Sequence, residues 1–195
     1  MGRGAVDPTT GIYVVNSSSV AQIYQLIPRD EYDRKNPNQK NGEASGYYAQ
    51  EGSPFAFHIE TFTNWLGMPC WKPPYGTMSA YDLGTGKLLW REPFGEIQQW
   101  GFYMPLSWGS VTIGAPVITR SGLVFIGASM DSRVRAIDVK SGQVLWQAQA
   151  EAPAVAMPAV YNYKGAEYVV FVAGGNSILL PRVSDQIVAY ALPSH

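Results

Sequence analysis

The chain has 195 residues, of which 46% are hydrophobic and 15% charged, with a formal net charge of −1. Its 20 glycines and 14 prolines add many turns, and this composition excludes a disordered chain. Because the Lys and Arg residues are few and scattered, we expect no nucleic-acid partner. No apolar run reaches the length of a membrane span, and Met1–Gly4 lacks the pattern of a leader, so neither is expected within these residues.

In chain order, the first elements are two short strands at Gly4–Asp7 and Ile12–Asn16, with a turn between them at Thr9–Gly11. A segment much longer than a hairpin requires follows. Its polar half, Arg29–Gly52, is typical of a functional or mobile loop. Its aromatic and Pro-rich half, from Pro54 to Gly76, predicts an ordered flap. The flap is either a surface excursion that packs its own aromatic residues or a lid over a ligand.

A hairpin pattern then occurs twice, as AYDLGTGKLLW at Ala80–Trp90 and AIDVKSGQVLW at Ala136–Trp146. Each copy predicts an alternating strand, a turn and a return strand. The Asp can accept hydrogen bonds from the turn, the Gly allows φ > 0, and the Trp must bury a large apolar area. We therefore expect each indole to contact the neighbouring unit. The alternative is a set of unrelated hairpins that share common turn chemistry.

Two further strand pairs complete the repeating units. Gly114–Ile118 with Leu123–Gly127 precedes the second hairpin, and Ala156–Val160 with Tyr168–Gly175 precedes a shortened copy, VAYALP, at Val188–Pro193. Such a repeat of short apolar strands and Gly turns is typical of propeller blades. The sequence thus predicts an all-β fold, a partial β-propeller of about three four-stranded antiparallel blades. The expected boundaries within one domain, 1–195, are 4–91 with an insertion at 25–76, then 110–148, then an incomplete blade at 154–193.

Residues that could carry chemistry on their own are sparse. Cys70 is the single cysteine, which leaves no disulfide or cysteine-based metal site, and a buried apolar role is expected for it. His58 and His195 have no spacing that makes a metal pair or a catalytic dyad. Asp131 and the other acidic residues outside the turns form no acid and base pair. The residues themselves therefore predict neither a catalytic group nor a metal ligand.

The same residues resemble those of quinoprotein dehydrogenases. The hairpins fit the tryptophan-docking motif of that family, and GMPCWKPPYGT within Gly67–Thr77 is similar to the G-x-P-C-x-x-P-P-x-G-T stretch of its glucose and quinate branch. Further stretches that carry the resemblance are GAVDPTTGIYVVN, YQLIPRDEY, PFAFHIETF, AVYNYKGAEYVVFVAGGNS and QIVAYALP. The resemblance covers essentially the whole chain.

The resemblance implies a portion of a larger enzyme. Members oxidise alcohols, sugars or polyols by hydride transfer to pyrroloquinoline quinone (PQQ) inside an eight-bladed propeller, beside a Ca²⁺ ion. Their catalytic Asp and metal ligands lie upstream of the part that this chain resembles. An Asn-Trp-Gly stretch that meets the cofactor in the family is replaced here by Met1–Arg3. We therefore expect the C-terminal blades, with no catalytic residue or metal site in this chain and no activity by the chain alone.

The resemblance assigns four positions to the cofactor side: Ile113 and Gly114 in a short inner-strand stretch, and Gly175 and Asn176 in the AGGNS stretch. Asn176 can hydrogen-bond a carboxylate or carbonyl oxygen of PQQ. For Ile113 and the glycines, the alternative is that inner strands of any propeller need small or apolar residues. For Asn176, it is a turn residue that tolerates left-handed geometry.

Two other functions remain open at this level. One is a non-catalytic propeller scaffold or protein-interaction module, and the other is an independent three-blade protein that closes its ring by oligomerisation. The expected partners are the upstream blades or a second copy, with ubiquinone or a cytochrome as the electron acceptor of the family. The resemblance also implies a periplasmic location.

Overall fold

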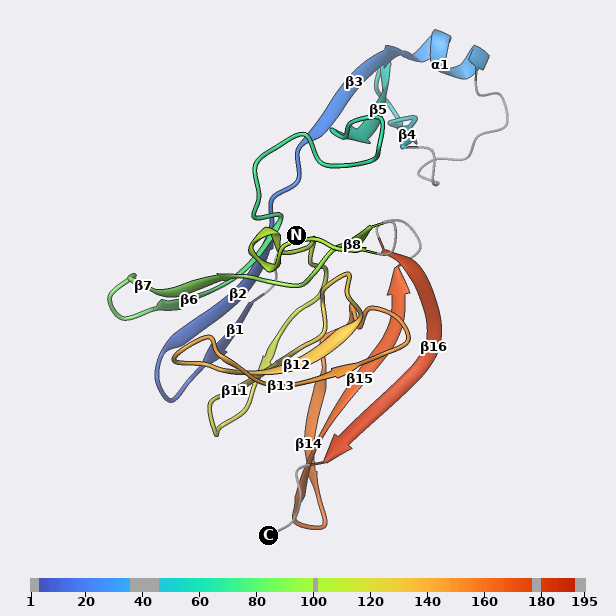
Figure 1. Ribbon diagram of the computed structural model, residues 1–195. Coiled ribbons are helices and arrows are strands. Elements are labelled where there is room, and N and C mark those ends of the chain that lie inside the picture. Colours follow the sequence, from blue (N-terminus) through green and yellow to red (C-terminus); the bar gives the residue numbers. More distant parts are fainter. Residues whose placement is uncertain (1–3, 36–45, 100–101, 177–179, 192–195) are drawn as a thin grey trace. The chain divides into compact units, whose positions relative to one another are not determined.

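The structure is a computed structural model that describes residues 4–35, 46–99, 102–176 and 180–191 (Figure 1). Met1–Arg3 and His195 lie outside these ranges. The chain divides into two compact units, one formed by Met1–Ser19 with Pro73–His195 and the other by Val20–Lys72. The second unit falls largely on the segment expected as the insertion at 25–76.

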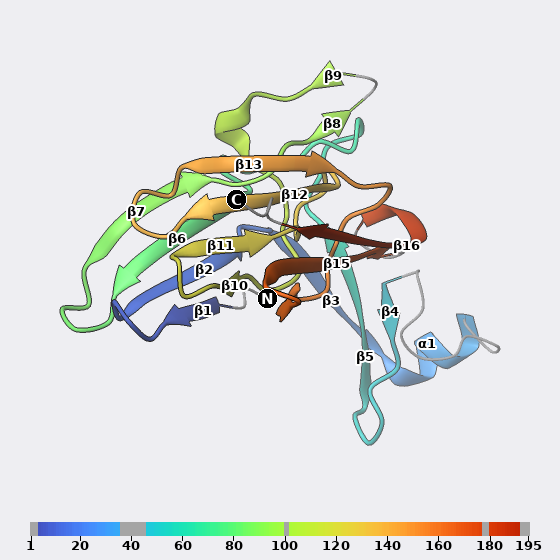
Figure 2. The same cartoon turned by 90° about the horizontal axis from the view of Figure 1, so that it is seen from below.

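Antiparallel strands form the larger unit (Figures 1 and 2). The first sheet has the order β1 (Gly4–Asp7), β2 (Ile12–Ser18), β6 (Gly76–Asp82), β7 (Leu88–Pro93). The second has the order β10 (Val117–Ile118), β11 (Leu123–Ile126), β12 (Arg133–Asp138), β13 (Val144–Gln149). The third, in the described part of the chain, has the order β14 (Ala159–Tyr163), β15 (Ala166–Asn176), β16 (Leu180–Ala191). Strands that follow one another along each sheet are typical of propeller blades, which confirms the all-β prediction.

Two small elements lie in the connection between the first and second sheets. The strand β8 (Gln98–Gln99) pairs antiparallel with β9 (Phe102–Tyr103), and a short 3-10 helix follows at Leu106–Trp108. Trp108 packs edge-on against the buried Tyr75, with the ring centroids 5.9 Å apart. Trp108 is thus part of the local packing.

The smaller unit has its own three-stranded sheet, with the order β3 (Gln22–Pro28), β5 (Phe55–Thr61), β4 (Tyr47–Tyr48). It also contains the helix α1 (Arg29–Lys35), where the sequence predicted a polar loop. Among the residues of this helix whose burial the structure describes, only Tyr32 is buried, and it packs against Ala49 and Ala56. One apolar side chain in a charged segment gives no helical periodicity, so the pattern alone could not reveal the helix.

Side chains that alternate between the two faces of the second sheet are buried on both faces. Val124 and Ile126 pack with Val14 and Met78 of the first sheet. Phe125, between them on the other face, packs with residues of the third sheet that include Phe171. The second sheet is therefore the layer to which both neighbours are attached.

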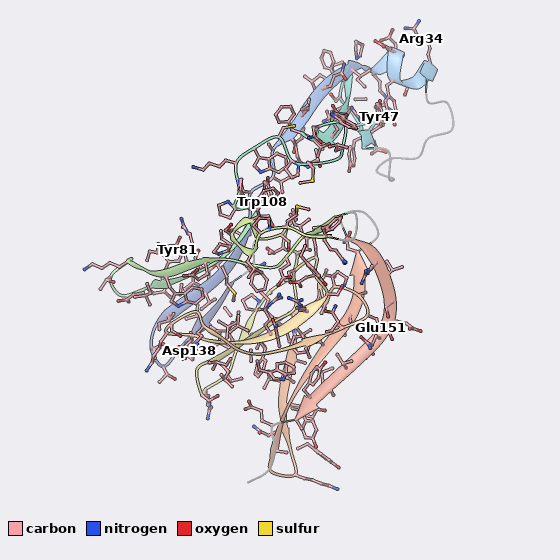
Figure 3. All side chains as sticks on the ribbon, viewed as in Figure 1. Arg34, Tyr47, Tyr81, Trp108, Asp138 and Glu151 are labelled. Carbon is pink, nitrogen blue, oxygen red and sulfur yellow. The ribbon has the colours of Figure 1, made fainter. Side chains whose placement is uncertain are left out.

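Three Asp turns of the same construction lie at the tips of the β1–β2, β6–β7 and β12–β13 hairpins (Figure 3 labels Asp138). In each, a Gly with φ between 70° and 75° donates its N–H to the Asp carbonyl four residues earlier, in the pairs Gly11 to Asp7, Gly86 to Asp82, and Gly142 to Asp138. The carboxylate accepts bonds from a hydroxyl and from amides of its own turn.

These turn bonds favour the ionised carboxylates. The Thr10 hydroxyl, followed by the Thr9 amide, lowers the pKa of Asp7. The Thr85 hydroxyl and the Gly84 amide lower the pKa of Asp82. The Ser141 hydroxyl does the same to the pKa of Asp138, against the opposing effect of burial.

Trp90 joins the first sheet to the second. Its indole N–H donates to the carbonyl of Val139 at 2.9 Å, and only 9% of the residue is exposed. A Cβ added to Gly142 would lie 2.7 Å from the Trp90 ring. The indole therefore lies against the turn of the next hairpin, as the sequence predicts.

Trp146, the repeat equivalent of Trp90, has different surroundings. It packs edge-on against Tyr190 of the third sheet, with the centroids 4.7 Å apart, and it is 37% exposed. An apolar cleft of about 490 Å³ lies beside it, with Leu145 and Val169 among the residues in its walls. Sheets two and three are thus less completely packed at this point than sheets one and two.

The Trp90 contact predicts unequal effects of two matched substitutions. Gly86→Ala and Gly142→Ala both place a side chain at positive φ, but a Cβ at Gly86 meets nothing within 4 Å. Gly142→Ala additionally displaces the indole, so we expect it to lower the free energy of unfolding by about 1–3 kcal/mol more. Urea unfolding of both variants checks this, and equal losses would contradict the contact.

The Asp turns predict a dependence on acid. Because the folded pKa of Asp138 is lowered from 3.8, its ionised form stabilises the fold above that pH, and the contribution is lost as the pH falls through the folded pKa. Asp138→Asn should therefore destabilise the protein at pH 7, with the difference from wild type shrinking below about pH 4. Unfolding curves at both pH values measure this difference, and a constant difference would be inconsistent with it.

Candidate functional site

Three of the four positions assigned to a cofactor lie near one another: Ile113 and Gly114 in the connection between the first two sheets, and Gly175 within β15. The N–H of Ile113 donates to the carbonyl of Ala128 at 2.8 Å. A Cβ added to Gly114 would lie 2.6 Å from the carbonyl of Val155. Gly175 donates its N–H to the carbonyl of Pro153 at 2.9 Å. The segment Pro153–Val155 therefore brings the two predicted stretches side by side.

The local backbone structure explains why glycine occupies positions 114 and 175. Gly114 has φ of 131° and Gly175 has φ of 71°. A Cβ added to Gly175 would lie 1.8 Å from the carbonyl oxygen of Arg182. Asn176 follows as the last residue of β15. Packing alone accounts for the two glycines, so contact with a cofactor stays a prediction for these positions.

Side chains of β2 form a clamp that holds Thr112–Gly114 and that the sequence does not predict. The amide Nδ2 of Asn16, on β2, donates to Thr112 Oγ1 at 2.9 Å and more weakly to the carbonyl of Gly114 at 3.4 Å. Ser18 Oγ accepts from the N–H of Thr112 at 2.9 Å and donates to its carbonyl at 3.1 Å. No local pattern could identify these partners, because Asn16 and Thr112 are 96 residues apart.

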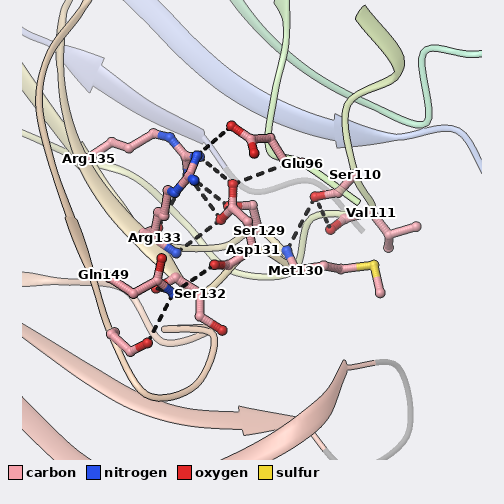
Figure 4. A network of polar contacts seen from close by, with 11 residues as sticks. Glu96, Ser110, Val111, Ser129, Met130, Asp131, Ser132, Arg133, Arg135 and Gln149 are labelled. Carbon is pink, nitrogen blue, oxygen red and sulfur yellow. Dashed lines mark hydrogen bonds and ion pairs between the residues drawn. The ribbon is translucent and has the colours of Figure 1, made fainter. Parts of the chain in front are cut away.

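A network of charged groups lies beside this clamp, at the β11–β12 connection (Figure 4). Asp131 forms a buried ion pair with Arg135, and both bind the hydroxyl of Ser129. Arg133 pairs with Glu96, on the chain between the first two sheets. The Asp131 that seems isolated in the sequence thus has a cation facing it, and the network fixes the loop between β11 and β12.

A polar cavity of about 580 Å³ opens next to the network. Its polar wall residues come from several connections: Gln98, Tyr103, Asp131, Gln149, Glu151 and Arg182 (Figure 3 labels Glu151). Glu151 accepts a hydrogen bond from Ser184 Oγ at 2.8 Å. Among the residues that the structure describes, the guanidinium of Arg182 has no partner. The cavity is of the size that holds a small ligand.

The other candidate residues form neither a metal cluster nor a disulfide in the part of the chain that the structure describes. Within the described ranges, no group of three or more His, Cys, Asp or Glu residues could hold a metal ion. Cys70 is exposed and unpaired with another cysteine, which differs from the buried role expected of it. No helix of the described chain is both long and apolar enough to span a membrane.

The chain matches a family model of dehydrogenases and curated proteins that are themselves named dehydrogenases. Residues 1–169 match the PQQ family described as glucose/ethanol/alcohol dehydrogenase, β-propeller domain. The chain is 36% identical, over its whole length, to 28% of the glycerol dehydrogenase large subunit of Gluconobacter oxydans (strain 621H). It is 32% identical, over 97% of its length, to 25% of the quinoprotein glucose dehydrogenase of Escherichia coli (strain K12).

A solved structure shares the fold. A europium-containing methanol dehydrogenase superposes on 88% of this chain and 24% of its own, with a TM-score of 0.55 and 22% identity. The chain therefore spans about a quarter of the length of its relatives. The family match over most of the chain confirms the resemblance found in the sequence, and the protein belongs to the PQQ-dependent dehydrogenase β-propeller family.

Proposed function

We propose that this chain supplies the C-terminal blades of a PQQ-dependent dehydrogenase that oxidises alcohols, sugars or polyols. The observation that supports the proposal is the meeting of Gly114, the neighbour of Ile113, and Gly175 at the segment Pro153–Val155, within a chain of this family. The connections between inner strands would form one wall of the quinone site.

The residues at this wall fit part of the cofactor. Ile113 offers an apolar surface to a ring, the Asn176 amide can donate to a carbonyl or carboxylate, and Arg182 brings a cation to the strand beside Gly175. PQQ, when bound, supplies the hydride acceptor. Within the described ranges, no group of three or more His, Cys, Asp or Glu residues could hold its Ca²⁺. We propose that this chain orients one edge of the cofactor and that other segments supply the proton acceptor.

The hairpins support a structural part of the same proposal. We propose that Trp90 and Trp146 are tryptophan-docking residues of the ring, because Trp90 already contacts the turn of the adjacent sheet. By similarity to the family, the protein would work in the periplasm and pass electrons to ubiquinone or a cytochrome. A non-catalytic scaffold would use the same hairpins but would not need the Asn16 and Ser18 clamp.

The partly exposed Trp146 and the apolar cleft beside it support the proposal that this surface binds a partner. In a full ring this surface would meet the remaining blades; in their absence we expect the chain to self-associate, because the apolar cleft between β13 and β16 is open. Light scattering of the purified chain should give a mass above the 21.4 kDa of one copy. A stable monomer would contradict self-association.

The quinone site can be tested with PQQ itself. Titration of the ¹⁵N-labelled chain with PQQ and Ca²⁺ should shift the backbone amide signals of Ile113, Gly114 and Gly175, while amides at the Asp82 and Asp138 turns stay in place. With glucose or glycerol and an artificial electron acceptor, we expect no turnover. An unchanged spectrum would overturn the proposed site, and turnover by the chain alone would show that the catalytic groups are present here.

A further inference from the structure

Asn16 interrupts an apolar stripe on β2. Ile12 and Val14, on the same face of this strand, belong to the core between the first two sheets. Asn16 follows in the same alternation and is 0% exposed. Its Oδ1 has no hydrogen-bond partner among the described residues. Burying such an acceptor is unfavourable, so an apolar residue would serve the core better at this position.

The amide nitrogen of Asn16, unlike its oxygen, is hydrogen-bonded within the described residues. Nδ2 bonds Thr112 Oγ1 at 2.9 Å and reaches the Gly114 carbonyl at 3.4 Å, on either side of Ile113. On the opposite side, the second sheet holds Ile113 through the carbonyl of Ala128. Ile113 is therefore fixed between a side-chain clamp from the first sheet and a backbone bond from the second.

We propose that Asn16 is a positioning residue of the quinone site, an inference that rests on the proposed function. It acts through the backbone of Thr112–Gly114, which it holds in the one conformation that presents Ile113 and the Gly114 amide to the cofactor. The unfavourable burial of Oδ1 is retained because the Nδ2 bonds cannot be replaced by an apolar side chain. Ser18 acts with it as a second, less buried part of the clamp.

The experiment compares four variants of the full chain. Asn16→Leu removes both amide functions at similar volume, and Ser18→Ala removes the second part of the clamp. Trp90→Phe is the matched control, because it weakens the same pair of sheets through the Val139 contact, away from Thr112. Ser17→Ala is a neutral control on β2, since Ser17 is exposed and bonds Thr77.

Three quantities are measured for each variant: the urea midpoint, amide hydrogen exchange at Ile113 and Gly114, and the dissociation constant for PQQ with Ca²⁺. Asn16→Leu should raise the PQQ constant about tenfold and speed exchange at Ile113 and Gly114, with little change in midpoint. Ser18→Ala should do the same to a smaller extent, which keeps the test decisive if Asn16→Leu does not fold. Trp90→Phe should lower the midpoint while leaving the PQQ constant within about twofold.

The outcomes separate the two proposals. Equal PQQ constants for wild type, Asn16→Leu and Ser18→Ala would overturn the role of Asn16 and leave the proposed function intact. Equal weakening by Asn16→Leu and Trp90→Phe would also overturn it, because binding would then follow stability alone. No PQQ binding by the wild-type chain would overturn the proposed function, and this inference with it.

Discussion

The contact between the Trp90 indole and the turn of the next hairpin is the constraint on which the rest of the structure depends. A single large side chain on β7 meets both the Val139 carbonyl and the Gly142 backbone of the second sheet. Because it fixes one end of the interface between two sheets, the other end can be held by weaker polar contacts. The Asn16 and Ser18 clamp provides those contacts.

The same reasoning explains why the third sheet is packed differently. Trp146 meets a ring, Tyr190, and an open apolar cleft in place of a completed turn. An indole that is more than a third exposed loses part of its hydrophobic contribution. The interface between sheets two and three therefore depends more on the core around Phe125 and Phe171. A partner surface at Trp146 would complete it.

Close backbone packing and a buried ion pair hold the region where the sheets are connected. Glycines permit the close approach of Gly114 to Val155 and of Gly175 to Arg182. The buried pair of Asp131 and Arg135 fixes the adjoining loop. Such a framework is suited to orienting a cofactor whose own chemistry performs the redox step.

The sequence by itself determined the strands, the Asp turns at Asp82 and Asp138, and the two repeated hairpins that carry Trp90 and Trp146, because turn chemistry and alternation act over a few residues. Its resemblance to the family also assigned Gly114 and Gly175 to the cofactor side. It did not predict that both glycines meet the segment Pro153–Val155. Only the tertiary structure decided the clamp at Asn16, the ion pair of Asp131 and the helix α1. Those features depend on which side chains the packed sheets and the folded insertion bring together, and no local spacing records such pairings.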